Sequence, residues 1–169
     1  MTEQRIHITQ GEYATASVPD VYISTLLGSC VSCCLWDPVA GVGGMNHMLL
    51  AKSPAATVRT LSGIHAMEML INDLIKQGAR KDRLSAKAFG GARMIKGLSD
   101  IGSQNAEFTV GYLSQECIPL VTQSLGGTHA RTLRFWPATG RVMQKLTDTR
   151  VVDVETAPVA APGHGVELF

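Results

Sequence analysis

The stretch VYISTLLGSCVSCCLW at residues 21–36 holds two strand-like runs, 21–26 and 30–36, separated by a Gly-Ser turn. Gly28 lets the backbone turn tightly and Ser29 is small, so the turn would hold the Cys30 thiol at a sheet edge, near backbone N–H groups. A second feature follows downstream, where His47 ends the segment Gly43-Gly44-Met45-Asn46-His47. A cysteine and a histidine are the pair that thiolate chemistry needs, one as nucleophile and the other as base and later acid. If the fold brings them together, the chain is a cysteine hydrolase.

Turn signals on both sides of this stretch divide its surroundings into strands. Asp37-Pro38 and residues 40–44 predict a turn, so we expect residues 46–50 to return as the second arm of a hairpin. Gly43 and Gly44 beside a strand indicate a bulge or a close approach of two backbones. Further strands are expected at residues 5–9, 84–89, 118–124, 132–136 and 141–146.

Two helices are expected among the later strands. The first begins after Ser62 as N-cap and stops at Gly78, because the apolar residues between them recur at spacings of three and four. These residues are Ile64, Met67, Leu70, Ile71, Leu74 and Ile75. The second covers residues 105–115, with Ala106, Val110 and Leu113 inward. Strands first, then helices among strands, predict an α+β fold built in layers.

Length and composition indicate one soluble domain. The 169 residues are 45% hydrophobic and 17% charged, which is usual for a globular domain. We expect a packed domain at residues 1–155 and a flexible C-terminal tail at 156–169, rich in Pro, Gly and Ala.

The formal net charge of +1 argues against nucleic-acid binding and against electrostatic attachment to a membrane. No apolar run approaches the roughly 20 residues of a membrane span, and the first residues lack the features of a signal peptide. We therefore expect a cytoplasmic protein with no direct membrane insertion and with its cysteines as thiols.

The four cysteines have different surroundings. The spacing Cys30-x-x-Cys33 would suit a metal or thiol exchange, but a zinc site commonly needs a second pair, and a strand points residues three apart to opposite faces. We expect no metal and no organic cofactor. Cys33, Cys34 and Cys117 are interpreted as small apolar fillers. The residue pattern alone leaves Cys30 open between a nucleophile and a buried thiol. It also leaves His47 open between a base and a half-buried structural residue.

These segments resemble CheD, the chemoreceptor glutamine deamidase family of bacterial chemotaxis. The resemblance is carried by Leu27-Gly28-Ser29-Cys30-Val31, Asp37-Pro38, Gly44-Met45-Asn46-His47 and Leu49-Leu50, and by the spacing from Cys30 to His47. It covers most of residues 5–147 and continues in Gly11-Glu12-Tyr13, Phe89-Gly90-Gly91-Ala92, Ile101-Gly102 with Asn105, and Gly126-Gly127 before Ala130-Arg131.

The resemblance implies a single-domain layered α/β/β sandwich similar to the cytotoxic necrotizing factor deamidases. It implies a cysteine-dependent protein-glutamine glutaminase that converts glutamine side chains of methyl-accepting chemotaxis receptors to glutamate, through a thioester on Cys30 and with His47 as base. The same machinery would cleave a glutamyl methyl ester. The implied partners are the cytoplasmic helical region of these receptors and the phosphatase CheC. Gly90-Gly91 and Gly126-Gly127 would let backbones approach the site or would simply form turns.

The third catalytic residue of the family is a threonine six positions before the cysteine, an offset that falls here on Ser24, with Thr25 as the alternate. A shift of one residue would turn the side chain to the other face of the strand.

Three other interpretations remain open. The chain would serve mainly as an adaptor that binds receptors and CheC with little catalysis, as a thiol redox sensor using Cys30 and Cys33, or as a cysteine amidase for small molecules. The last would need an enclosed pocket.

Overall fold

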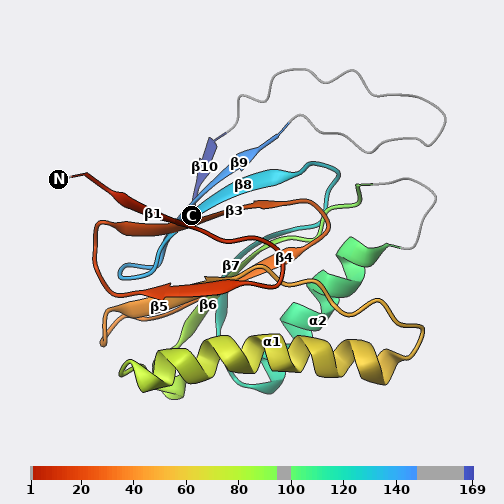
Figure 1. The fold of residues 1–169 in the computed structure, drawn as a ribbon, viewed down its shortest axis with the longest axis horizontal. Coiled ribbons are helices and arrows are strands. Elements are labelled where there is room, and N and C mark those ends of the chain that lie inside the picture. Colours follow the sequence, from red (N-terminus) through yellow and green to blue (C-terminus); the bar gives the residue numbers. More distant parts are fainter. Residues whose placement is uncertain (1, 95–99, 148–165) are drawn as a thin grey trace.

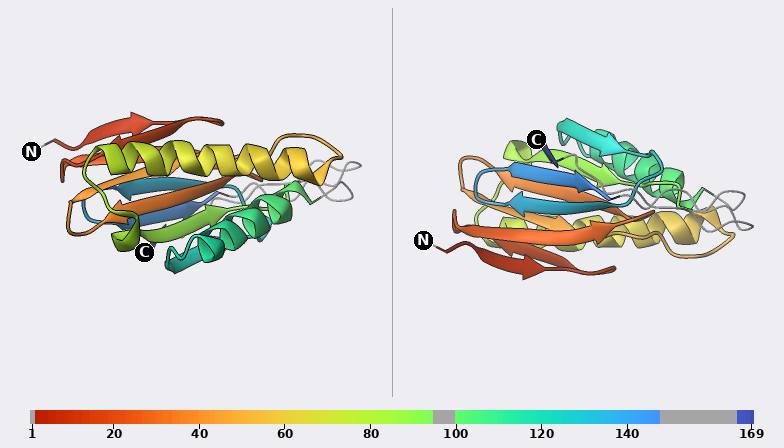
Figure 2. Two further views of the ribbon diagram at one scale, coloured as in Figure 1. Left: turned by 90° about the horizontal axis from the view of Figure 1, so that it is seen from below. Right: turned by 90° about the horizontal axis from the view of Figure 1, so that it is seen from above.

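The computed structural model describes residues 2–94, 100–147 and 166–169, which form three packed layers (Figure 1). One layer consists of the helices α1 (Ala56–Lys76) and α2 (Ile101–Gln115), and the other two are five-stranded sheets. Both helices lie against the same sheet, so neither of them covers the far face of the other sheet (Figure 2). The predicted layered α/β/β architecture is confirmed.

The two sheets are named here by whether helices cover them. The helix-covered sheet has the order β2 (Tyr13–Ala16), β5 (Val42–Asn46), β4 (Val31–Asp37), β6 (Ser85–Gly90), β7 (Leu120–Leu125). The open sheet has the order β1 (Gln4–His7), β3 (Val21–Leu27), β8 (Arg131–Trp136), β9 (Arg141–Leu146), β10 (Val166–Leu168). The short 3-10 helix η1 (Lys81–Arg83) precedes β6. The β1–β3 and β6–β7 pairs are parallel, and the other pairs are antiparallel.

The layers enclose two apolar cores on the two faces of the helix-covered sheet. Cys33 and Leu35 face α1 and α2, whereas Cys34 faces the core between the two sheets. This alternation follows from the two-residue repeat of a strand. It also places Cys30 in the inter-sheet core and Cys33 on the opposite face, as the sequence predicted.

The helix boundaries differ from the predicted ones. Helix α1 begins at Ala56, so Ser62 is not its N-cap. Instead the Ser62 hydroxyl donates to the Arg59 carbonyl at 2.6 Å and accepts the Ala51 N–H at 2.9 Å. Helix α2 begins at Ile101, after Asp100 as N-cap. Ile75 and Val110, expected to point inward, are 45% and 38% exposed, because each lies at the border of its apolar stripe.

The return strand of the predicted hairpin lies earlier than expected. Strand β5 contains both Gly43 and Gly44, and residues 47–50 have already left it. A Cβ atom on Gly43 would lie 2.6 Å from the Pro137 carbonyl oxygen, and one on Gly44 would lie 2.7 Å from the Ala14 carbonyl oxygen. The glycines therefore mark a close backbone approach within a strand. The small size of these two glycines also lets β2 pair with β5, and β2 is a strand that the sequence did not predict.

The end of the chain returns to the sandwich. Val166–Leu168 forms β10 beside β9, and the Phe169 ring packs 5.2 Å from the Phe89 ring between centroids. Residues 166–169 belong to the segment expected to be a flexible tail, but here residues 166–168 pair with a sheet edge and Phe169 packs against the inter-sheet core. Residues 156–165 lie outside the described residues.

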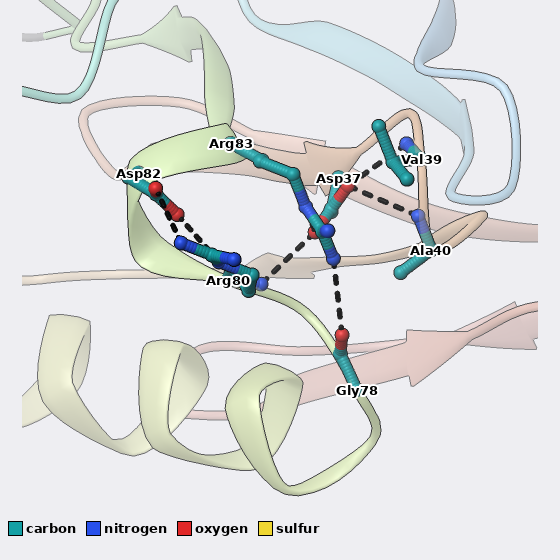
Figure 3. A network of polar contacts seen from close by, with 7 residues as sticks. All are labelled: Asp37, Val39, Ala40, Gly78, Arg80, Asp82 and Arg83. Atoms are coloured by element: carbon teal, nitrogen blue, oxygen red, sulfur yellow. Dashed lines mark hydrogen bonds and ion pairs between the residues drawn. The ribbon is translucent and has the colours of Figure 1, made fainter.

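A buried carboxylate anchors the turn between β4 and β5 (Figure 3). Asp37 Oδ1 accepts the N–H groups of Val39 and Ala40, and Oδ2 accepts the Arg80 N–H and the Arg83 guanidinium at 2.9 Å each. Burial acts to raise the pKa of Asp37, but these hydrogen bonds outweigh it and lower the pKa to about 2. The carboxylate thus fastens the turn to η1.

Candidate active site

A hydrogen bond links the two sheets where β3 passes the end of β5. Thr25 of β3 lies 2.7 Å from His47, measured from Oγ1 to Nδ1, and its hydroxyl donates to the Ile8 carbonyl at 2.8 Å. A hydroxyl has one proton to donate. Because the Thr25 hydroxyl donates its hydrogen bond to Ile8, its oxygen accepts one from the Nδ1–H of His47. The neutral imidazole then carries its proton on Nδ1, and Nε2 is left as the basic nitrogen.

Ser24 points to the opposite face of the open sheet. Its hydroxyl lies 3.0 Å from Nδ1 of His7, on the neighbouring strand. The structure therefore brings Thr25, and not Ser24, to His47. The offset favours Ser24 as the third residue, but the structure places the Ser24 hydroxyl away from His47, because a step of one residue along a strand reverses the side chain.

Cys30 and His47 lie on adjacent segments of the helix-covered sheet. They directly precede Val31 and Met48, which exchange two backbone hydrogen bonds of 3.0 and 2.8 Å. Both side chains face the open sheet, since Cys30 packs in the inter-sheet core and His47 bonds to Thr25. Cys30 and His47 occupy diagonal positions across this antiparallel pair, where Cα atoms are roughly 7–8 Å apart. No hydrogen bond joins the Cys30 thiol to the His47 ring within the described part of the chain.

One side chain from α2 fixes both segments of the site. The Asn105 amide donates to the Ser29 carbonyl at 2.9 Å, and its oxygen accepts the Leu50 N–H at 3.1 Å. Asn105 is fully buried. It therefore ties the turn before Cys30 to the segment after His47. Asn105 is not among the predicted site residues, although a polar residue on the inward face of a helix is a signal that could have identified it.

Glycines pack directly against the cysteine. Gly90 has φ +109°, and a Cβ there would lie 2.2 Å from the Cys30 carbonyl oxygen, which also accepts the Gly91 N–H at 2.9 Å. Gly126 has no atom within 4 Å of its Cβ position. Gly90 and Gly91 thus let their backbone approach Cys30 closely, whereas Gly126 allows the chain to turn.

Burial sets the protonation states of the Cys30 thiol and the His47 imidazole. It raises the pKa of the Cys30 thiol. It also lowers the pKa of His47, as does the charge of His7, while Glu12 opposes them. Glu12 itself stays ionised, because the Thr9 hydroxyl at 2.6 Å and the Thr9 N–H at 2.8 Å lower its pKa. The resting pair is thus a neutral thiol beside a neutral imidazole.

The other cysteines are in surroundings unsuited to nucleophilic attack or are far from His47. Cys33 and Cys34 are fully buried, and burial raises the pKa of Cys33 to about 12 and that of Cys34 well above its ordinary value. Cys117 follows the end of α2 with φ 56° and is exposed, so its predicted burial is wrong. All four are free thiols. Across the described ranges, no group of three or more His, Cys, Asp or Glu residues could hold a metal ion.

A small pocket lies beside the histidine. It has a volume of about 190 Å³ and is bordered by Glu12 and His47 on one side and by His65 and Met69 of α1 on the other.

In the described part of the chain, neither helix is both long and apolar enough to cross a membrane.

Comparison with known proteins gives consistent matches. The family model described as CheD chemotactic sensory transduction matches residues 49–146. The probable chemoreceptor glutamine deamidase CheD of Agrobacterium fabrum is 51% identical over 98% of this chain and 97% of its own length. Proteins of the same name from Rhizobium rhizogenes and Caulobacter vibrioides are 52% and 50% identical, over 99% and 98% of this chain and 97% and 93% of their own lengths.

Proposed function

Because the chain belongs to the CheD family, we propose that it is a chemoreceptor glutamine deamidase that uses Cys30 as its nucleophile. The reaction hydrolyses a glutamine side chain of the receptor to glutamate and ammonia. The contact between Thr25 and His47 supports this assignment of roles. It occupies Nδ1 and leaves Nε2 of His47 free to act as a base, on the same face of the helix-covered sheet as Cys30.

The first step forms a bond between Cys30 Sγ and the carbonyl carbon of the glutamine side chain. His47 Nε2 takes the thiol proton as sulfur attacks, and the carbonyl electrons move onto oxygen. The N–H groups of Ser29 and Cys30 donate to no described residue, so they are available to stabilise this oxyanion. Thr25 Oγ1 accepts a hydrogen bond from Nδ1–H of the imidazolium and holds the ring in place.

The remaining steps return the enzyme to its resting state. The oxyanion collapses, the carbon–nitrogen bond breaks, and His47 gives its proton to the departing ammonia, which leaves a thioester on Cys30. His47 then takes a proton from water, the resulting hydroxide attacks the thioester, and the thiolate leaves and regains the proton. A glutamyl methyl ester would follow the same course with methanol as the leaving group.

The relatives favour a protein substrate, since they are named chemoreceptor glutamine deamidases. The pocket beside His47 lies against α1 and is not lined by Cys30, so its volume has no bearing on the substrate. We propose the cytoplasmic helical region of the receptor as the docking partner and CheC as a second partner.

The direct test is mass spectrometry of a purified chemoreceptor after incubation with the protein. Wild type and the matched control Cys117→Ala should convert glutamine to glutamate, and Cys30→Ala should not. Equal conversion by Cys30→Ala would contradict the proposal. Receptor binding and unchanged signalling with Cys30→Ala would favour the adaptor interpretation instead.

A further inference from the structure

Neither α1 nor α2 covers the outer face of the open sheet, which carries no other helix in the described part of the chain (Figure 2, right). Strand alternation and register identify the side chains that point outward from its strands. None of them is acidic. They are Arg5, His7, Tyr22, Ser24, Leu26, Thr132, Arg134, Trp136, Arg141, Met143, Lys145, Val166 and Leu168, and we call this set the open face.

Among the described residues, the cations of the open face form no ion pair with an acidic side chain. The three ion pairs among the described residues all lie between residues 37 and 116. Arg5, Arg134, Arg141 and Lys145 are all exposed, and none pairs with a described carboxylate. Unpaired cations gathered on one face form a local positive field that a complementary acidic surface would neutralise.

Aromatic rings hold two of these cations in fixed positions. The Arg134 guanidinium lies 5.3 Å from the Tyr22 ring centroid, and that of Arg141 lies 4.6 Å from the Trp136 ring centroid. The two rings contact each other at 5.4 Å, and the Trp136 indole donates to Glu3 at the border of the face. A stacked guanidinium presents its N–H groups as a planar fork, the geometry that binds carboxylates in a bidentate manner.

The dimensions of the open face match one helix. The cations extend from β1 across β3 and β8 to β9, which is three strand spacings or about 14 Å. An α-helix with its side chains is roughly 10–12 Å across. Thr132, Arg134, Lys145 and Val166 border a hollow of about 480 Å³ in this face. Leu26, which is 56% exposed, offers apolar contact beside the charges.

We propose that the open face binds an acidic helical segment of a protein partner, with its carboxylates against Arg5, Arg134, Arg141 and Lys145. A long polyanion fits less well. The chain has 15 Lys and Arg against 14 Asp and Glu, so apart from the four cations of this face it has 11 Lys and Arg against 14 Asp and Glu and offers no basic excess to extend along a duplex or a lipid bilayer. The proposal does not depend on the deamidase activity.

The test measures binding of a fluorescent helical peptide of about 20 residues, roughly 30 Å long, with glutamates along one face. A matched peptide carries glutamine at those positions. Wild type should bind the glutamate peptide at least tenfold more tightly than the glutamine peptide. Arg134→Gln with Lys145→Gln should weaken binding of the glutamate peptide about tenfold. The control pair Lys52→Gln with Lys76→Gln has the same net charge and lies outside the open face, so it should change binding by less than about twofold.

Thermal unfolding of each variant shows whether it is folded, and amide shifts in NMR spectra map the bound peptide in the wild type. Shifts confined to β1, β3, β8 and β9 would support the proposal, as would the expected loss. Equal affinity for both peptides, an equal loss in the control pair, or shifts elsewhere would overturn it. So would tighter binding to a short DNA duplex or to phosphatidylserine vesicles.

Discussion

Replacing Thr25 with valine removes the group that orients His47 while keeping the shape of the side chain. The change deletes two hydrogen bonds, one from His47 Nδ1 and one to the Ile8 carbonyl. Thr25 is 1% exposed, so water cannot readily replace either partner. We expect Thr25→Val to slow deamidation and to lower stability.

The size of both effects follows from the lost contacts. A hydrogen bond to a charged group contributes about 1.5–3 kcal/mol, and His47 becomes charged in the attack. Since 1.36 kcal/mol is a factor of ten in rate, kcat should fall about tenfold to hundredfold. The unpaired Ile8 carbonyl should lower the free energy of unfolding by about 1–3 kcal/mol.

The assay compares three variants by initial rate on a receptor fragment and by urea unfolding. Thr25→Ser keeps the hydroxyl and should retain most of the rate. Ser24→Ala removes the contact with His7 on the opposite face and should change the rate by less than about twofold. If Ser24→Ala were as slow as Thr25→Val, or if Thr25→Val kept the wild-type rate, the assignment of Thr25 would be refuted.

Three further predictions concern titration and buried contacts. The rate should fall in acid as His47 becomes protonated, with a midpoint below pH 6.5 because burial lowers the pKa of His47; an acid midpoint above 6.5 in the pH–rate profile would contradict this. The Asp37 pKa of about 2, against an ordinary 3.8, means that its contribution of about 2 kcal/mol is complete above about pH 4 and is lost as the pH falls toward 2. Asp37→Asn should therefore be destabilised by about that amount at pH 7 in urea titrations, and a difference that stays constant down to pH 2 would argue against it. Asn105→Leu strands a carbonyl and an N–H, so it should cost about 2 kcal/mol and speed hydrogen exchange at Leu50, whose amide should otherwise stay protected.

The architecture could be predicted from local patterns because each layer follows a simple period. Apolar residues at helical spacing identified α1, and alternation placed Cys30 and Cys33 on opposite faces of the helix-covered sheet. The third site residue could not be settled in this way. Both faces of β3 are buried at this point, with Ser24 5% and Thr25 1% exposed, so hydrophobic alternation gives no sign of which hydroxyl points inward.

Contacts between distant segments account for the other differences. Nothing local marks Gly43 and Gly44 as strand residues, since their place in β5 depends on Ala14 and Pro137. The net charge of +1 describes the whole chain and conceals the separation of charges that places four exposed cations and no acidic side chain among the described residues of the open face. Such features depend on which elements become neighbours, and composition averages over them.

The central claim is that Cys30 carries the acyl group, and trapping that intermediate tests it most directly. The protein is incubated with a receptor peptide that bears a glutamyl ester, quenched in acid and digested, and the adduct is located by mass spectrometry. The account predicts a thioester on the peptide containing Cys30, with none on Cys33, Cys34 or Cys117. An adduct on another cysteine, or full turnover by Cys30→Ser, would contradict it.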